Sequence, residues 1–210
     1  MHYKNWVNRY PQLHQLIAIS KTRGLDEIEA LFNQGFTDFG ENRVDELALK
    51  AEHFIDINWH FIGHIQSNRL QDIVHYASWI HSVESVKQIQ LIEQYASLEN
   101  KHINVLLQLN LTQESQKSGM TIAEIDACIS TLEKCTYAHM RGFMVMGPSD
   151  VDLKKTEACF KQAYGIFHRY RDRNPQIDEL SMGMSQDYMI AYQYGSTMFR
   201  LGTVLFNSKV

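Results

Sequence analysis

Short apolar runs alternate with longer amphipathic stretches along the chain. Each run except the last is followed by a stretch with apolar residues at helical spacing, as at Leu25, Ile28 and Leu31. Strands that alternate with helices in this way form a parallel sheet. Eight repeats favour a closed barrel over an open doubly wound sheet, so we predict an α/β fold, a single (β/α)8 TIM-type barrel with parallel strands. The runs of strand type are 15–20, 37–40, 59–63, 79–83, 103–111, 140–147, 179–185 and 198–206.

Composition limits the number of domains and the kinds of partner that we expect. The chain has 210 residues, 44% hydrophobic and 21% charged, with no linker rich in Pro, Gly or Ser. We therefore expect one domain over residues 1–210, in a barrel more compact than the typical ~250 residues. The formal net charge of -4 offers no broad basic surface. It argues against nucleic acid or an anionic membrane as the main partner.

Cysteine usage and the N-terminal sequence predict the compartment. The three cysteines form no CxxC pair, which is typical of reduced thiols. The first residues lack the apolar stretch of a secretory signal, and no run reaches the ~18 apolar residues of a membrane span. We therefore expect a cytoplasmic protein. No cluster of His, Asp and Glu has metal-ligand spacing, so we expect no metal site.

The active site of such a barrel lies at the carboxyl ends of the strands, which makes Lys21 a candidate for chemistry. Lys21 directly follows an apolar run and shares a strand face with Ile17 and Ile19. We expect its side chain in the barrel mouth, where burial favours the neutral amine that attacks an aldehyde. The alternative is a lysine at a strand end whose tip simply reaches water.

A second candidate is the segment LSMGMSQD at 180–187. Gly183 and the small side chains of Ser181 and Ser185 let backbone amides approach an anion closely. A helix that begins near Asp187 would favour an anion at its N-terminus, and Ser185 would cap it or bind a phosphate oxygen. Serine and glycine are also common at any strand-to-helix turn, so the ordinary turn remains an alternative.

The third candidate is the segment GSTMFRLGT at 195–203. Arg200 lies within an apolar strand, and a buried guanidinium needs an acceptor or an aromatic partner. Gly202 allows close approach, and Thr203 offers a hydroxyl and an amide. In many barrels a phosphate binds after strands seven and eight, which is where both glycine-bearing segments fall.

Several of these segments together resemble the pyridoxal phosphate homeostasis proteins. The match runs from about residue 15 to the end in the order and spacing of that family, whose barrel is similar to the N-terminal domain of alanine racemase. Of the motifs, WHFIG, SMGMS and GST-M-R-GT are jointly specific. The matching segments are IAISKT, FGEN, WHFIGHIQSNR, IHSVES, RGFMVMG, LSMGMSQDY and GSTMFRLGTVLF.

The resemblance implies pyridoxal 5′-phosphate (PLP) as the cofactor, held as an internal aldimine on Lys21. It implies that Met184 and Ser185 bind the phosphate, and that Gly202 and Thr203 add to the phosphate site. The segment after Lys21 departs from the family, because Arg23 and Gly24 stand where Lys-Pro is usual. The missing proline loosens this loop, and Arg23 faces either solvent or phosphate.

The remaining site residues also follow from the resemblance. Arg200 is expected to face the pyridine nitrogen of PLP, and Asn42 and His81 are expected to line the pocket. For Met144 we predict packing against the ring. A fixed cation beside the pyridine nitrogen disfavours its protonation and weakens the ring as an electron sink.

The functional hypothesis is a PLP-binding protein of intracellular vitamin B6 homeostasis, without catalytic turnover. It rests on the family motifs and on the end of the chain soon after the eighth strand, which leaves no room for the second domain of the racemase-like relatives. We expect a monomer whose partners are PLP and possible PLP-dependent apoenzymes. One alternative is a racemase-like PLP enzyme that uses Tyr164, Tyr188 or Tyr192 as a second base. Another is a barrel that binds a different phosphorylated metabolite.

Overall fold

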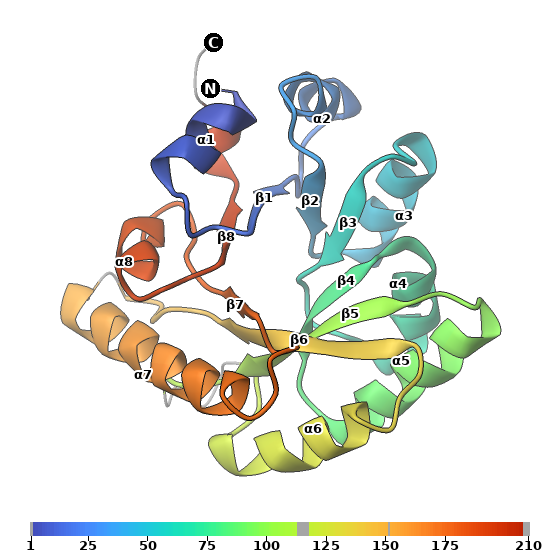
Figure 1. Ribbon diagram of the computed structural model, residues 1–210. Helices are drawn as coiled ribbons and strands as arrows, with labels where there is room; N and C mark the ends of the chain where they lie inside the picture. Colours follow the sequence, from blue (N-terminus) through green and yellow to red (C-terminus); the bar gives the residue numbers. More distant parts are fainter. Residues whose placement is uncertain (1, 113–117, 151, 208–210) are drawn as a thin grey trace.

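The computed structural model describes residues 2–112, 118–150 and 152–207. Its eight strands are all parallel and close into a barrel in chain order, with β8 paired back to β1 (Figure 1). The predicted (β/α)8 barrel is therefore confirmed. The strands are β1 (Gln15–Ile19), β2 (Asp38–Glu41), β3 (Asn58–Phe61), β4 (Trp79–Val83), β5 (Ile103–Leu109), β6 (Ala138–Val145), β7 (Glu179–Ser181) and β8 (Met198–Leu201).

Helices follow the strands and surround the barrel (Figure 1). Short 3-10 turns precede two of them, η1 (Ser67–Arg69) and η2 (Ile122–Glu124). The α-helices are α1 (Tyr3–Arg9), α2 (Leu25–Phe32), α3 (Val44–His53), α4 (Leu70–Tyr76), α5 (Val86–Leu98), α6 (Ile125–Leu132), α7 (Leu153–Arg171), α8 (Tyr188–Gln193) and α9 (Thr203–Phe206).

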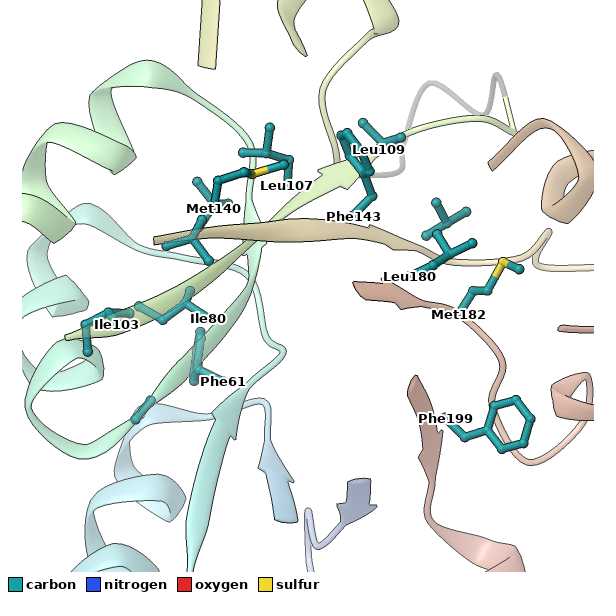
Figure 2. Close-up of a cluster of buried hydrophobic side chains, with 14 of the residues drawn as sticks. Phe61, Ile80, Ile103, Leu107, Leu109, Met140, Phe143, Leu180, Met182 and Phe199 are labelled. Carbon is teal, nitrogen blue, oxygen red and sulfur yellow. The ribbon is translucent and has the colours of Figure 1, made fainter. Parts of the chain in front are cut away.

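Strand alternation divides the apolar side chains into two cores. The larger core lies between the barrel and its helices, and Figure 2 shows part of it on the outward faces of β3 to β8. The smaller core fills the barrel interior and includes Ile17, Ile19 and Met144. Because Ile17 and Ile19 point inward, the same phase directs position 21 to the mouth at the carboxyl end of β1.

The structure differs from the predicted elements at both ends of the chain. The run 198–206 was expected as one strand, but the strand ends at Leu201 and α9 begins at Thr203. Gly202 separates the two elements with backbone angles that continue neither. Helix α1 was not predicted, because Trp6 is its one buried residue and a seven-residue helix carries little periodic signal.

Among the described residues, no helix combines the length and the apolar character that crossing a bilayer requires. The three cysteines, Cys128, Cys135 and Cys159, form no disulfide bond.

Candidate functional site at the carboxyl ends of the strands

Lys21 directly follows β1, and its side chain is exposed. Within residues 2–112, 118–150 and 152–207 the ammonium group has no hydrogen-bond or ion-pair partner. The expected burial of Lys21 is therefore wrong for this structure: its stem leaves the apolar interior at Ile19 and its tip reaches water. The position at the mouth agrees with the prediction, whereas desolvation of the amine does not.

A second lysine, Lys50 on α3, holds the chain just before Lys21. Its side chain is buried, and its Nζ donates to the Ser20 carbonyl at 2.8 Å, to Glu41 Oε1 at 2.6 Å and to Glu46 Oε2 at 2.9 Å. These contacts use the three donors of an ammonium group. Burial raises the pKa of Glu41, and the hydrogen bonds from Lys50 and Ser20 oppose that shift.

The chain just after Lys21 is held by the same cluster. The Thr22 backbone N–H donates to Glu46 Oε2 at 2.9 Å, and the Ser20 hydroxyl donates to Glu41 Oε1 at 2.6 Å. Thr22 has φ of 61°, a left-handed conformation that is costly for a β-branched residue. The cluster therefore fixes the backbone on both sides of Lys21 and stabilises a strained turn.

Arg200 on β8 is buried, as the sequence predicted, and it finds the acceptors that a buried guanidinium needs. Nη1 donates to the Ser181 hydroxyl at 2.7 Å and Nη2 donates to the Val145 carbonyl at 3.0 Å. No carboxylate among the described residues lies within ion-pair distance of it. Burial lowers the pKa of Arg200 to about 10, against the opposing charge of Asp187, so the group stays cationic at neutral pH.

Four further residues continue from Arg200 across the barrel interior. Ser181 Oγ lies 3.2 Å from His81 Nδ1, and His81 Nε2 lies 2.9 Å from His60 Nδ1. The second nitrogen of His60 lies 3.2 Å from Asp38 Oδ1. Burial lowers the pKa of both histidines, and that of His81 falls well below its usual value. We call this series the interior chain; its members are Arg200, Ser181, His81, His60 and Asp38.

Two other predicted residues lie at different depths in the same half of the barrel. Met144 is buried in the interior core with Ile19, at the level of the mouth. Asn42 is exposed in the loop after β2, where it lines an open cavity of about 410 Å³ with Arg43 and His64. The structure therefore places Met144 below the opening and Asn42 on its rim.

The two glycine-bearing turns lie side by side, because the Arg200 N–H donates to the Gly183 carbonyl at 3.0 Å. Gly183 has φ of +94°, and an added Cβ would lie 2.6 Å from Ala191 Cβ on α8. The Met184 N–H already donates to Asp187 Oδ1 at 2.6 Å. Asp187 thus holds one of the amides that we expected for a phosphate.

Two hydroxyl side chains remain at these turns. Ser185 is half-buried and Thr203 is exposed at the start of α9. Neither hydroxyl has a partner within the part of the chain that the structure describes. Ser185 does not cap α8, whose first residue is Tyr188. It therefore keeps its hydrogen-bonding capacity, as the phosphate prediction requires.

Arg23 and the tyrosines considered as bases lie away from the mouth interior. Arg23 Nη1 pairs with Glu27 Oε1 at 2.9 Å, so its charge is used by α2. Tyr188 and Tyr192 contact the outward-facing Phe199 ring. The described contacts of Tyr164 are made on the outer shell, so none of these tyrosines is placed as a second base.

The family model described as alanine racemase, N-terminal domain, matches residues 2–209. The chain belongs to this family. It is 34% identical over 207 residues to the pyridoxal phosphate homeostasis protein of Vibrio alginolyticus, an alignment that covers 96% of this chain and 89% of that protein. That likeness places the chain among the pyridoxal phosphate homeostasis proteins.

Solved structures agree with this assignment. PipY of Synechococcus elongatus, in its structure without PLP, has a TM-score of 0.88 and 34% identity, and the match covers 93% of each chain. The structure of PipY with PLP bound has a TM-score of 0.85 and 33% identity, again over 93% of each chain.

Sequence reasoning missed two groups of residues that support the site. Lys50 was overlooked, although it lies three residues after the buried Leu47 on the apolar stripe of α3. A lysine on such a stripe is a signal of a buried ion pair. The link between His60 and His81 was also missed, although each lies at an inward position of its strand.

Proposed function

We propose that this protein binds PLP at the carboxyl end of its barrel and holds it for the PLP supply of the cell, without catalytic turnover. Support comes from the relatives, which are named pyridoxal phosphate homeostasis proteins, and from the solved relative that contains PLP. The observation that carries the proposal is Arg200, a buried cation at the mouth with no carboxylate partner in the described residues.

The residues at the mouth match the three polar parts of PLP. PLP supplies an aldehyde, which condenses with a lysine amine with loss of water. Lys21 is the lysine that we assign to this bond, because its amine is exposed at the mouth and unpartnered within the described residues. The other lysine of the region, Lys50, is excluded because all three of its N–H donors are engaged with acceptors.

For the pyridine ring we assign Arg200 and Met144. Two N–H groups of Arg200 are used by Ser181 and Val145, and a guanidinium has five. Its remaining donors suit a pyridine nitrogen without a proton. Met144 offers an adaptable apolar surface to a ring above the interior core. Asn42 and His81 complete the lining, Asn42 from the rim and His81 from below.

For the phosphate we assign Ser185, Gly202 and Thr203, with Met184. The two hydroxyls are unpartnered within the described residues, and glycine lets an anion approach the backbone. The Met184 amide is available only when Asp187 releases it. Ser185 and the start of α9 are therefore the groups that bind phosphate first.

A carrier, rather than an enzyme, is the function that this site favours. A guanidinium held beside the pyridine nitrogen keeps the nitrogen unprotonated, and such a ring is a poor electron sink. The tyrosines considered as second bases pack on the outer shell. We further propose that the protein is a cytoplasmic monomer that exchanges PLP with PLP-dependent apoenzymes.

The test is a covalent label. Purified protein is incubated with PLP, reduced with borohydride and digested, and the labelled peptide is identified by mass. We expect one label, on Lys21, which Lys21→Ala abolishes. The matched control is Lys87→Ala, which removes an exposed lysine on α5 and leaves the label intact. A label that survives in Lys21→Ala would disprove the assignment.

Turnover is tested separately on the loaded protein. Exchange of the α-deuterium of alanine, serine and other amino acids is followed against free PLP at equal concentration. We expect no excess over free PLP. Sustained exchange well above that background would replace the carrier by a racemase-like enzyme.

A further inference from the structure

The hydrogen bonds of the interior chain have a fixed direction, which can be worked out from the Asp38 end. An ionised carboxylate only accepts, so His60 Nε2, at 3.2 Å, carries the ring proton. Burial lowers the pKa of His60, so near neutral pH the ring keeps a single proton. His60 Nδ1 is then an acceptor, and the N–H that it accepts is that of His81 Nε2 at 2.9 Å.

The same reasoning continues to Arg200. Burial also lowers the pKa of His81, so its Nδ1 has no proton and accepts the hydroxyl of Ser181 at 3.2 Å. With its hydrogen turned toward His81, the Ser181 oxygen presents a lone pair to Arg200 Nη1 at 2.7 Å. Arginine is a donor only. Both ends of the chain therefore require the same direction, from Arg200 toward Asp38.

Packing holds the rings in the orientation that this direction needs. His60 stacks on Trp79, with ring centroids 5.5 Å apart and planes within 10° of each other. The guanidinium of Arg141 covers Trp79 at 5.3 Å. His60 and His81 are both completely buried, so water offers neither ring an alternative partner. A buried polar network whose members are all satisfied is rigid and specific.

We propose that the interior chain positions Arg200. One edge of the guanidinium is held by Ser181, whose hydroxyl is fixed in a single orientation by donating to His81 only while the histidines keep their tautomers. The remaining N–H groups then point in one set of directions, which suits a pyridine nitrogen that accepts. Asp38 and His60 are positioning residues that act on the cofactor site without touching it. The part that concerns the pyridine ring rests on the proposed function.

The test compares two substitutions at Asp38, the far end of the chain. Asp38→Asn keeps an oxygen that accepts from His60 Nε2. Asp38→Leu removes the acceptor, so the tautomer of His60 with its proton on Nδ1 becomes the one of lower free energy. His60 then donates to His81 Nε2, and His81 in turn carries its proton on Nδ1. The substitution therefore reverses a tautomer two residues along the chain.

Tautomers are read by long-range ¹⁵N–¹H correlation on the full chain with labelled histidine. The protein has ten histidines, and the signals of the pair are assigned from their loss in His60→Phe and His81→Gln. We expect Nε2–H on both rings in the parent and in Asp38→Asn, and Nδ1–H on both in Asp38→Leu. Nδ1–H on His81 in the parent, or an unchanged His81 in Asp38→Leu, would overturn the proposal.

A second variant covers the case in which Asp38→Leu does not fold. His60→Phe keeps an aromatic ring on Trp79 and removes both nitrogens. We expect His81 to lose its fixed Nε2–H tautomer. A His81 that retains a single Nε2–H signal in this variant also counts against the proposal, because the direction would then not come from His60.

The link to the cofactor has its own readout, the absorbance maximum of the PLP-loaded protein. We expect a shift of this maximum in Asp38→Leu and in His60→Phe, and none in Asp38→Asn. If the tautomers reverse and the absorbance spectrum does not change, the interior chain acts only within the barrel core. That result would refute the proposal that it positions Arg200. The tautomer experiment needs no PLP, so failure of PLP to bind would refute the proposed function alone.

Discussion

The Lys50 ammonium donates a hydrogen bond to the Ser20 carbonyl at 2.8 Å, so a buried lysine holds the residue that precedes Lys21. Lys50 also pairs with Glu41, whose side chain is completely buried. Breaking a buried ion pair on one side leaves an uncompensated charge. The backbone of the turn that carries Lys21 thus depends on a buried charge cluster.

Lys50→Met should lower the free energy of unfolding by about 3–5 kcal/mol, because it leaves Glu41 buried without its partner. Urea unfolding measures the loss. Lys101→Met is the matched control, since among the described residues Lys101 donates only to the carbonyls of Val74 and His75, and its loss should cost about 1 kcal/mol. Equal losses of unfolding free energy in the two variants would mean that the Lys50–Glu41 ion pair contributes no more than the hydrogen bonds of Lys101.

Arg200→Lys should weaken PLP binding at least about tenfold, equivalent to about 1.4 kcal/mol. Lysine keeps the charge but lacks the planar fork that reaches Ser181 and a ring nitrogen together. Absorbance titration with PLP gives the dissociation constant. Arg171→Lys is the control, because Arg171 is exposed at the end of α7 and its substitution should leave PLP affinity unchanged. Tight binding by Arg200→Lys would contradict the assigned role.

Acid should destabilise the fold through the interior histidines. Their pKa values are lowered in the folded state, so the unfolded chain binds more protons once the pH falls through the ordinary value of about 6.5. Stability is therefore present above that pH and is lost below it. Each histidine contributes a slope of up to about 1.4 kcal/mol per pH unit.

The measurement is the free energy of unfolding from pH 7 to pH 5 in the parent and in His60→Phe. The pKa values of Glu41 and Glu179 are raised and act in the opposite direction, but they are common to both proteins. The slope should therefore fall by up to about 1.4 kcal/mol per pH unit in the variant. An identical slope would show that His60 is not kept neutral by the fold.

Gly183→Ala should destabilise the protein by several kcal/mol, because it combines a positive φ with a Cβ 2.6 Å from Ala191 Cβ. Gly165→Ala provides the opposite control. Gly165 lies inside α7 with no atom within 4 Å of an added Cβ, so the change should stabilise by about 0.5–1 kcal/mol. Thermal unfolding of both variants measures the sign and the size of each change in stability.

Periodicity was sufficient to predict the barrel, because every strand contributes apolar residues to the outer core and β1, β4, β5, β6 and β8 also contribute to the interior core. It also placed Lys21 correctly, since Ile17 and Ile19 fix the phase of β1. Where elements are short, the pattern failed: α1 has one buried residue, and α9 follows β8 after a single glycine. In both places tertiary packing, not local spacing, decides the structure.

The environment of each side chain was less predictable than its position. Arg200 was expected to be buried and is, since a charge inside an apolar strand has no other place. Lys21 was expected to be buried and is exposed, because the strand ends before it. The partnership of His60 with His81 joins two strands 21 residues apart, and no local pattern encodes it.

The contrast between the fixed backbone around Lys21 and its unattached side chain has a consequence for loading and release. Under the proposed function, only the four-carbon stem of Lys21 has to reorganise when the amine binds or releases the PLP aldehyde. The backbone on both sides of Lys21 is already held by hydrogen bonds, so loading requires no rearrangement of this turn. A PLP carrier built in this way needs no opening of its barrel before it releases the cofactor.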